Sequence, residues 1–247
     1  MYSLENQDNF GRTVSEFFEA QRLNKGKADY KPGDFINKWI QRYGIGQRFN
    51  IESLPGGIGL VLKIYQGEED SEGRILADFG YGISQLVSIL LEIETSILKA
   101  ETVSEVSIVN YEKQTAELFR LFNAGVERHV PICIAIEEPE IHLHPKYQSL
   151  LADMFMDAYQ NYGINFLIET HSEYLIRKLQ TYVGKKMLSP DAFSILYAEE
   201  NPEPGAERIK RIGLREDGRF TDKFGSGFFD EADSLAMDLL KIKAGLL

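Results

Sequence analysis

The feature that most constrains the fold is an alternation of short apolar runs with amphipathic stretches in the second half of the chain. The run 132–136, Ile-Cys-Ile-Ala-Ile, ends abruptly in acidic residues, and a second run, 164–168, follows after one helix-length. The first run is unbroken and is typical of a parallel strand buried on both faces, and the second, which contains Asn165, predicts another short buried strand. We therefore predict an α/β fold with a mostly parallel core sheet, flanking helices and antiparallel additions, in which Cys133 is a small core residue.

Periodicity places the remaining elements. Apolar residues recur at helical spacing in several segments. We predict helices at 13–23, 33–43, 83–100, 112–128, from Pro145, from Thr170, where a Thr170–Glu173 capping box starts the helix, and in the tail through Leu235, Leu239 and Leu240. Segments rich in β-formers predict a small antiparallel sheet at 48–53, 59–65 and 74–79, and a hairpin-like end at 193–198 and 208–214.

Composition excludes some classes of function. The net charge of -11 argues against binding nucleic acid by bulk electrostatics, and we expect the basic cluster at 208–215 to be a solvated strand face. One cysteine cannot form an internal disulfide. No run reaches the roughly 20 apolar residues needed to span a bilayer, and the start lacks a signal pattern. We expect one main domain in a soluble, cytoplasmic protein without a membrane partner.

Polar residues follow both apolar runs where the predicted strands end. Glu137 and Glu138 close the first strand, and His171 follows the second. Ligands of open α/β sheets bind beyond the carboxyl ends of the strands. Two adjacent carboxylates there can divide the work, one reaching the hydration shell of Mg2+ and the other orienting a water as general base, with an imidazole near a terminal phosphate.

These strings resemble a known family. ICIAIEEPEIHLHPKYQSLL resembles the Walker B segment of prokaryotic ABC-type ATPases, AAA-family proteins related to RecF, SMC heads and the overcoming-lysogenisation-defect nucleases. INFLIETHSEYLI resembles their switch-histidine segment, and LADFGYGISQLVSILLEI their signature segment. The tail DGRFTDKFGSGFFDEA resembles a C-terminal domain of unknown function in a subgroup of bacterial ATPases. The matches run in the family's order from about Phe35, and imply the C-terminal portion of a P-loop NTPase-like head.

The resemblance implies roles for individual residues. Glu137 would be the Walker B carboxylate near Mg2+, Glu138 the catalytic base and His171 the switch histidine. The signature element would comprise Gly80, Gly82, Ser84 and Gln85. In such heads a glycine-rich turn at a helix N-terminus presses on the γ-phosphate of ATP held by the opposite subunit, so the resemblance implies ATP, Mg2+ and a homodimer or head-to-head ATPase partner.

Two departures from the family pattern stand out. The Walker B acid is Glu137 where transporter-type ABC proteins have Asp, although the related ATPases also use EEPE. The chain also has no G-x-x-x-x-G-K-[ST] P-loop: Gly56-Gly57-Ile58-Gly59 and Gly184-Lys185-Lys186 both fail the pattern and are predicted to be a turn and a helix end. Three explanations are open. The Walker A lobe belongs to a longer polypeptide, which we favour, or another chain supplies it, or the protein has lost ATP hydrolysis.

Three functions follow as hypotheses. The first is an ATPase half-head that dimerises on nucleotide and controls an effector, such as a nuclease or another DNA-directed or defence activity. Its parts would be 1–79 (remnant of the lobe), 80–200 (signature, Walker B and switch histidine) and 201–247 (extension). The second is a non-catalytic dimerisation module. The third is a metal-dependent hydrolase, whose ligands would be Glu137, Glu138, Glu140, His142, His144 and His171.

Overall fold

The computed structural model describes residues 4–24, 33–57, 59–67, 69–109, 132–199, 208–225, 228–229 and 231–244. The chain divides into two compact units, Met1–His171 and Ser172–Leu247. The helix predicted at 112–128 lies outside the described residues. The three-part division at 79/80 and 200/201 stays a prediction.

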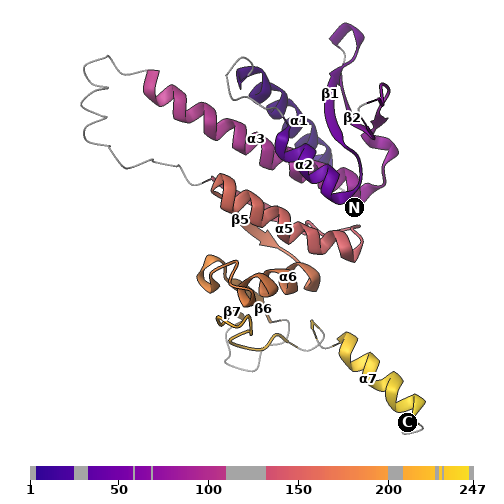
Figure 1. Cartoon of the computed structure of the whole chain (residues 1–247), viewed down its shortest axis with the longest axis vertical. Coiled ribbons are helices and arrows are strands. Elements are labelled where there is room, and N and C mark those ends of the chain that lie inside the picture. The colour runs from indigo at the N-terminus through magenta and orange to yellow at the C-terminus, as the bar shows by residue number, and fades with distance from the viewer. Residues whose placement is uncertain are drawn as a thin grey trace. The chain divides into compact units, whose positions relative to one another are not determined.

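Three helices build the first part of unit 1. They are α1 (Leu4–Asn24), α2 (Asp34–Tyr43) and α3 (Tyr81–Val109), and α3 contacts both of the others (Figure 1). The helical periodicity therefore predicted these elements correctly, although α1 begins before Thr13 and α3 runs beyond residue 100.

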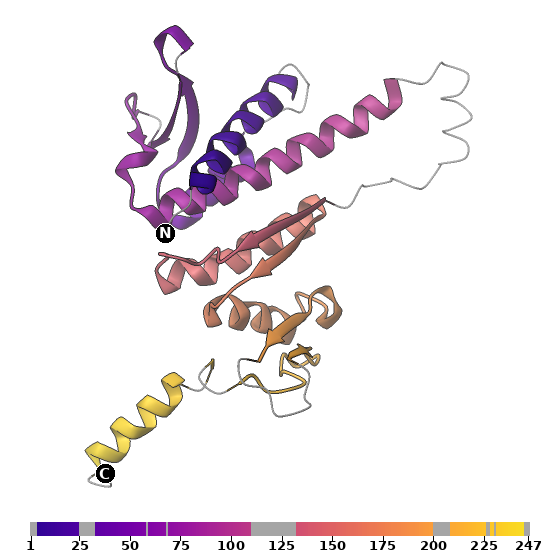
Figure 2. The same cartoon turned by 180° about the vertical axis from the view of Figure 1, so that it is seen from behind.

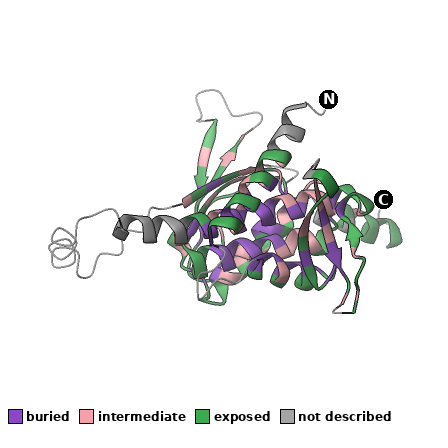
Figure 3. Cartoon of the chain, turned by 90° about the horizontal axis from the view of Figure 1, so that it is seen from above, coloured by how far each residue is buried: buried purple, intermediate pink, exposed green. Residues whose placement is uncertain are grey.

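The apolar face of α3 forms the core of this part. Leu86, Leu90 and Ile93 are fully buried, and buried residues lie on the inward faces of the helices (Figure 3). Within α3, the segment Tyr81–Lys99 is long and apolar enough to cross a membrane by length and composition alone. Because 61% of that window is buried inside the protein, it is accounted for as a core helix.

A small antiparallel sheet follows α2, as predicted. Its strands β1 (Arg48–Ser53), β2 (Leu60–Tyr65) and β3 (Arg74–Ile75) pair in sequence order. Short 3-10 turns occur at Pro55–Gly57 and Leu76–Asp78, so the third predicted strand is cut to two residues.

The second part of unit 1 is a parallel strand–helix–strand element. It consists of β4 (Ile132–Glu137), α5 (Pro145–Tyr162) and β5 (Ile164–Glu169), and β4 pairs with β5 in parallel. Both strands lie on the same side of α5 (Figure 2). The rings of Phe155 on α5 and Phe166 on β5 are 4.8 Å apart, which fixes the inner face of the sheet.

The prediction that these strands are buried on both faces is wrong. Alternate residues are exposed along both strands, and the paired positions Cys133 and Asn165, Ala135 and Leu167 share the outer face. Leu167 is 65% exposed. The prediction that Cys133 is a core residue is wrong for the same reason, because it is exposed. Successive side chains of a strand point to opposite faces, and among the described elements of unit 1 a helix covers one face only.

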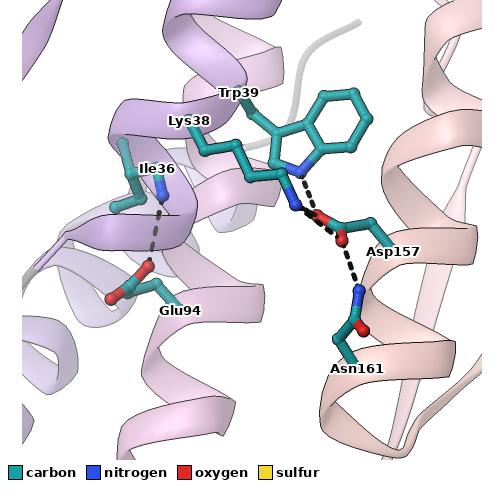
Figure 4. A network of polar contacts seen from close by, with 6 residues as sticks. All are labelled: Ile36, Lys38, Trp39, Glu94, Asp157 and Asn161. Carbon is teal, nitrogen blue, oxygen red and sulfur yellow. Dashed lines mark hydrogen bonds and ion pairs between the residues drawn. The ribbon is translucent and has the colours of Figure 1, made fainter.

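A polar network joins α2 to α5 (Figure 4). The carboxylate of Asp157 accepts hydrogen bonds from Lys38 Nζ at 2.7 Å, from Trp39 Nε1 at 2.9 Å and from Asn161 Nδ2 at 2.7 Å. Glu94 on α3 accepts from the backbone N–H groups of Gly33 and Ile36 and so caps the N-terminus of α2.

Unit 2 comprises α6 (Glu173–Gly184), a 3-10 turn at Pro190–Ala192, the antiparallel pair β6 (Ile195–Ala198) and β7 (Ile209–Ile212), and α7 (Glu231–Lys243). These elements agree with the prediction. The helix cap does not: Ser172, rather than Thr170, is the N-cap of α6, and its hydroxyl accepts from Leu175 N. Aromatic rings pack together, mostly edge to face, in a small cluster of Tyr197, Phe220, Phe224, Phe228 and Phe229.

Candidate functional site

The carboxyl ends of β4 and β5 coincide. The parallel register pairs Glu137 with Glu169, so the segments that follow the two strands leave the sheet at one edge. Both glutamates are exposed. The backbone N–H of Glu138 donates to Glu169 O at 2.8 Å and extends the pairing by one residue beyond the strand. This edge carries the site residues predicted from the strand ends.

The acidic loop then turns sharply. Glu138 has φ 44° and His142 has φ 59°, both in the left-handed region that non-glycine residues rarely adopt. Backbone hydrogen bonds hold the turn, from Ile141 N to Glu138 O at 3.2 Å and from Leu143 N to Glu140 O at 3.0 Å. Strained backbone of this kind is held in place by its surroundings and is frequent at functional sites, since it costs about 1–3 kcal/mol per residue.

The turn directs the Glu138 carboxylate towards His171. Glu138 Oε1 lies 3.6 Å from His171 Nε2, with the two side chains 40% and 74% exposed. That separation is within ion-pair range but too long for a hydrogen bond, so neither side chain fixes the orientation of the other. A half-exposed carboxylate beside an imidazole has the components of a general base and a phosphate contact.

Glu140 occupies a different environment from its neighbours. It is 7% exposed, and its Oε1 accepts a hydrogen bond from the backbone N–H of His171 at 2.5 Å. Its Oε2 is buried and has no hydrogen-bond partner among the described residues. An unsatisfied buried acceptor costs about 1–3 kcal/mol, so the buried position of this carboxylate has to be maintained by the packing around it.

The N-terminus of α3 packs on the same loop. Gln85 Nε2 donates to Glu138 O at 3.1 Å, and the Tyr81 and His142 rings meet edge to face at 5.0 Å. A Cβ on Gly82 would lie 2.5 Å from His142 O, so only glycine fits there. Gly80 precedes the helix, and its carbonyl accepts hydrogen bonds from the backbone N–H groups of Ile83 and Ser84. Of the four predicted signature residues, Gly82 and Gln85 are thus brought against the acidic loop of the same chain, whereas a Cβ on Gly80 would have nothing within 4 Å.

The two loop histidines have structural surroundings. His144 is the N-cap of α5, and its Nδ1 accepts from Lys146 N at 3.2 Å. The His142 ring packs on Tyr81. Within the ranges that the structure describes, no group of three or more His, Cys, Asp or Glu side chains is arranged to hold a metal ion. The arrangement counts against the metal-dependent hydrolase with its six predicted ligands.

The edge does fit a cation that needs fewer ligands from the protein. Mg2+ keeps several waters and takes one or two carboxylates together with phosphate oxygens, and Glu137 presents an exposed carboxylate at the strand end. A phosphate cradle is a different matter, because residues 1–247 contain no G-x-x-x-x-G-K-[ST] sequence.

Sequence reasoning missed three contacts of this site. They are the Glu140–His171 hydrogen bond, the Gln85–Glu138 hydrogen bond and the close approach of Gly82 to His142 O. The acidic sequence made Glu140 a candidate metal ligand, but no local pattern distinguished this buried glutamate from its more exposed neighbours. The sequence predicted that Gly80 and Gly82 form a turn at a helix N-terminus, but it did not predict that Gly82 packs against His142.

A parallel strand–helix–strand element with carboxylates and an imidazole at one sheet edge fits an α/β, P-loop-like fold. Comparison with protein families agrees: the family described as "AAA ATPase domain" matches residues 5–176. The chain belongs to this family, which indicates ATP binding and hydrolysis in general, with a nucleotide and typically Mg2+. No match was found among curated proteins.

Proposed function

We propose that this chain forms the Walker B and switch-histidine part of an ABC-type ATP-hydrolysing head, related to RecF, SMC and overcoming-lysogenisation-defect proteins. The observation that carries the proposal is the placement of Glu138 and His171 3.6 Å apart at one edge of the β4–β5 sheet. Membership of the AAA ATPase domain family supports the reaction class.

Each site residue has a role in the proposal. Magnesium-bound ATP supplies an electrophilic γ-phosphorus when it is present. Glu137 would hold the hydration shell of the cation from the strand end, and Glu138 would accept the proton of the attacking water. His171 would donate towards the terminal phosphate. The α3 N-terminus, which begins just after Gly80, presents the positive end of its helix dipole to an anion.

The phosphate cradle comes from a P-loop outside residues 1–247, on another segment or another chain. The open outer face of the β4–β5 sheet supports this part of the proposal, because Ala135 and Leu167 leave apolar side chains uncovered there. A P-loop-bearing element that packs on this face or pairs with a free strand edge would remove that apolar surface from water.

Nucleotide-dependent dimerisation follows if the signature residues act across two heads. Gly82 and Gln85 already contact the acidic loop of their own chain, so a nucleotide bound at one head would reach the other through this contact. Control of a DNA-directed or defence-related effector, such as a nuclease, is proposed by analogy with the resembling proteins.

The test uses the complex that this chain forms in its own cells, purified through a tag on the chain. Glu138→Gln should lower kcat for ATP by about 100- to 10,000-fold with little effect on nucleotide binding, because it removes the base and keeps the shape. Glu169→Gln is the matched control: it removes a charge from an exposed side chain at the same sheet edge and should leave kcat unchanged. Equal turnover by wild type and Glu138→Gln would refute the assignment.

A second candidate is a non-catalytic dimerisation module. The sequence observation that favours it is the absence of a P-loop. It predicts that the purified complex neither binds nor hydrolyses ATP while the chain still self-associates, measured by light scattering. Turnover that disappears in Glu138→Gln would exclude it.

A further inference from the structure

We propose that Glu140 is a positioning residue for His171: its buried carboxylate fixes the backbone of the switch-histidine segment so that the imidazole faces Glu138. This inference rests on the proposed ATPase function for its consequence, but its structural part can be tested without any nucleotide.

The geometry is specific to one oxygen. Glu140 Oε1 accepts from His171 N at 2.5 Å, which is a short hydrogen bond. Among the described residues this is the hydrogen bond that the Glu140 side chain makes, since Oε2 is buried without a partner. Because the Glu140 side chain is 7% exposed and accepts from one backbone N–H, we assign it the role of holding the backbone of His171.

The link connects two loops that the strands alone do not join. Glu140 lies in the turn after β4, and His171 is the second residue after β5. Glu138 lies in the same turn as Glu140. Its backbone N–H donates to Glu169 O, and its carbonyl accepts a hydrogen bond from Gln85 Nε2. Three hydrogen bonds therefore anchor the acidic turn to β5, α3 and His171, and the one from Glu140 holds the backbone of the histidine.

This role depends on reach more than on charge. Glu140→Gln keeps an acceptor oxygen at the same distance, so it should preserve most of the link. Glu140→Asp keeps the charge but withdraws the oxygen by about one C–C bond, roughly 1.5 Å, and should lose it. Glu140→Ala removes it altogether. A residue that acted through its charge would give the opposite order for Gln and Asp.

The direct readout is the His171 amide resonance in the 247-residue chain labelled with 15N-histidine. The chain has four histidines, so four signals are expected, and His171→Gln identifies the relevant one. In wild type the His171 amide proton should lie downfield because its hydrogen bond to the carboxylate is short. It should stay near that position in Glu140→Gln and move upfield in Glu140→Asp and Glu140→Ala. Circular dichroism checks that each variant folds, and Glu169→Gln is the matched control.

The functional readout is a double-mutant cycle in the purified complex. If Glu140 acts through His171, then Glu140→Asp should lower kcat by itself but add nothing to His171→Ala. An unmoved amide signal in folded Glu140→Asp, or additive effects on kcat, would overturn the inference. If instead the complex fails to hydrolyse ATP while the amide signal moves as expected, the ATPase proposal fails and the structural link stands.

Discussion

Replacing Asp157 by alanine should destabilise unit 1 through one buried donor. The indole N–H of Trp39 donates to Asp157 Oδ2 at 2.9 Å, and Trp39 is fully buried. Removing the carboxylate leaves that N–H without an acceptor, at a cost of about 1–3 kcal/mol. Lys38 is 46% exposed and can turn to water, so its ion pair adds only about 0–1 kcal/mol. We expect a total loss of about 1–4 kcal/mol.

The assay is urea denaturation followed by tryptophan fluorescence. Trp39 is the only tryptophan in the chain, so its fluorescence reports the unfolding of unit 1. Asp157→Asn keeps an acceptor for the indole and should cost less than Asp157→Ala, and Lys38→Ala should cost about 1 kcal/mol or less. A free energy of unfolding for Asp157→Ala within about 0.5 kcal/mol of wild type would refute the reasoning.

The same network has a pH dependence. Burial raises the pKa of Asp157, but hydrogen bonds from Lys38, Trp39 and Asn161 outweigh burial and hold the pKa below its ordinary value. A group with a lowered folded pKa stabilises the protein above its unfolded pKa, about 3.9 for aspartate, and loses that contribution as the pH falls through the folded pKa. The stability difference between wild type and Asp157→Ala should therefore shrink below about pH 4.

Three further outcomes are expected. Gly82→Ala should destabilise the chain by about 1–3 kcal/mol in urea, since its Cβ would meet His142 O at 2.5 Å, whereas Gly80→Ala, with nothing within 4 Å, should not. Burial raises the pKa of Glu94 to about 7, so wild-type stability should fall by up to about 3 kcal/mol between about pH 4.5 and 7, a slope that Glu94→Gln abolishes. Exposed Cys133 should react with a maleimide in the isolated chain and be protected in the purified complex; equal rates in both would show that the outer sheet face stays uncovered.

The elements of this protein could be predicted because their signals are local. Helical spacing of apolar residues gave α2, α3 and α5, and a proline at the first helical position marked the start of α5. The placement of glutamates and a histidine directly after two apolar runs predicted that they share one sheet edge, since the ends of paired parallel strands coincide. The register confirms this expectation, because Glu137 at the end of β4 pairs with Glu169 at the end of β5.

The burial of the sheet could not be predicted in the same way. An apolar run such as ICIAI gives no information on how many neighbours cover it, and a strand with one covered face and a strand with two can have the same sequence. Cys133 and Leu167 are exposed because the described elements cover only the inner face.

The sequence by itself determined which residues form helices and strands, and which chemistry follows the strands. The tertiary structure alone decided the partners. Glu140 meets His171 across 31 residues, Gln85 meets Glu138 across 53, and Trp39 meets Asp157 across 118. The physical reason is that periodicity records the orientation of a side chain relative to its own helix or strand. A hydrogen bond between distant segments depends on how whole elements pack, and no local spacing encodes that.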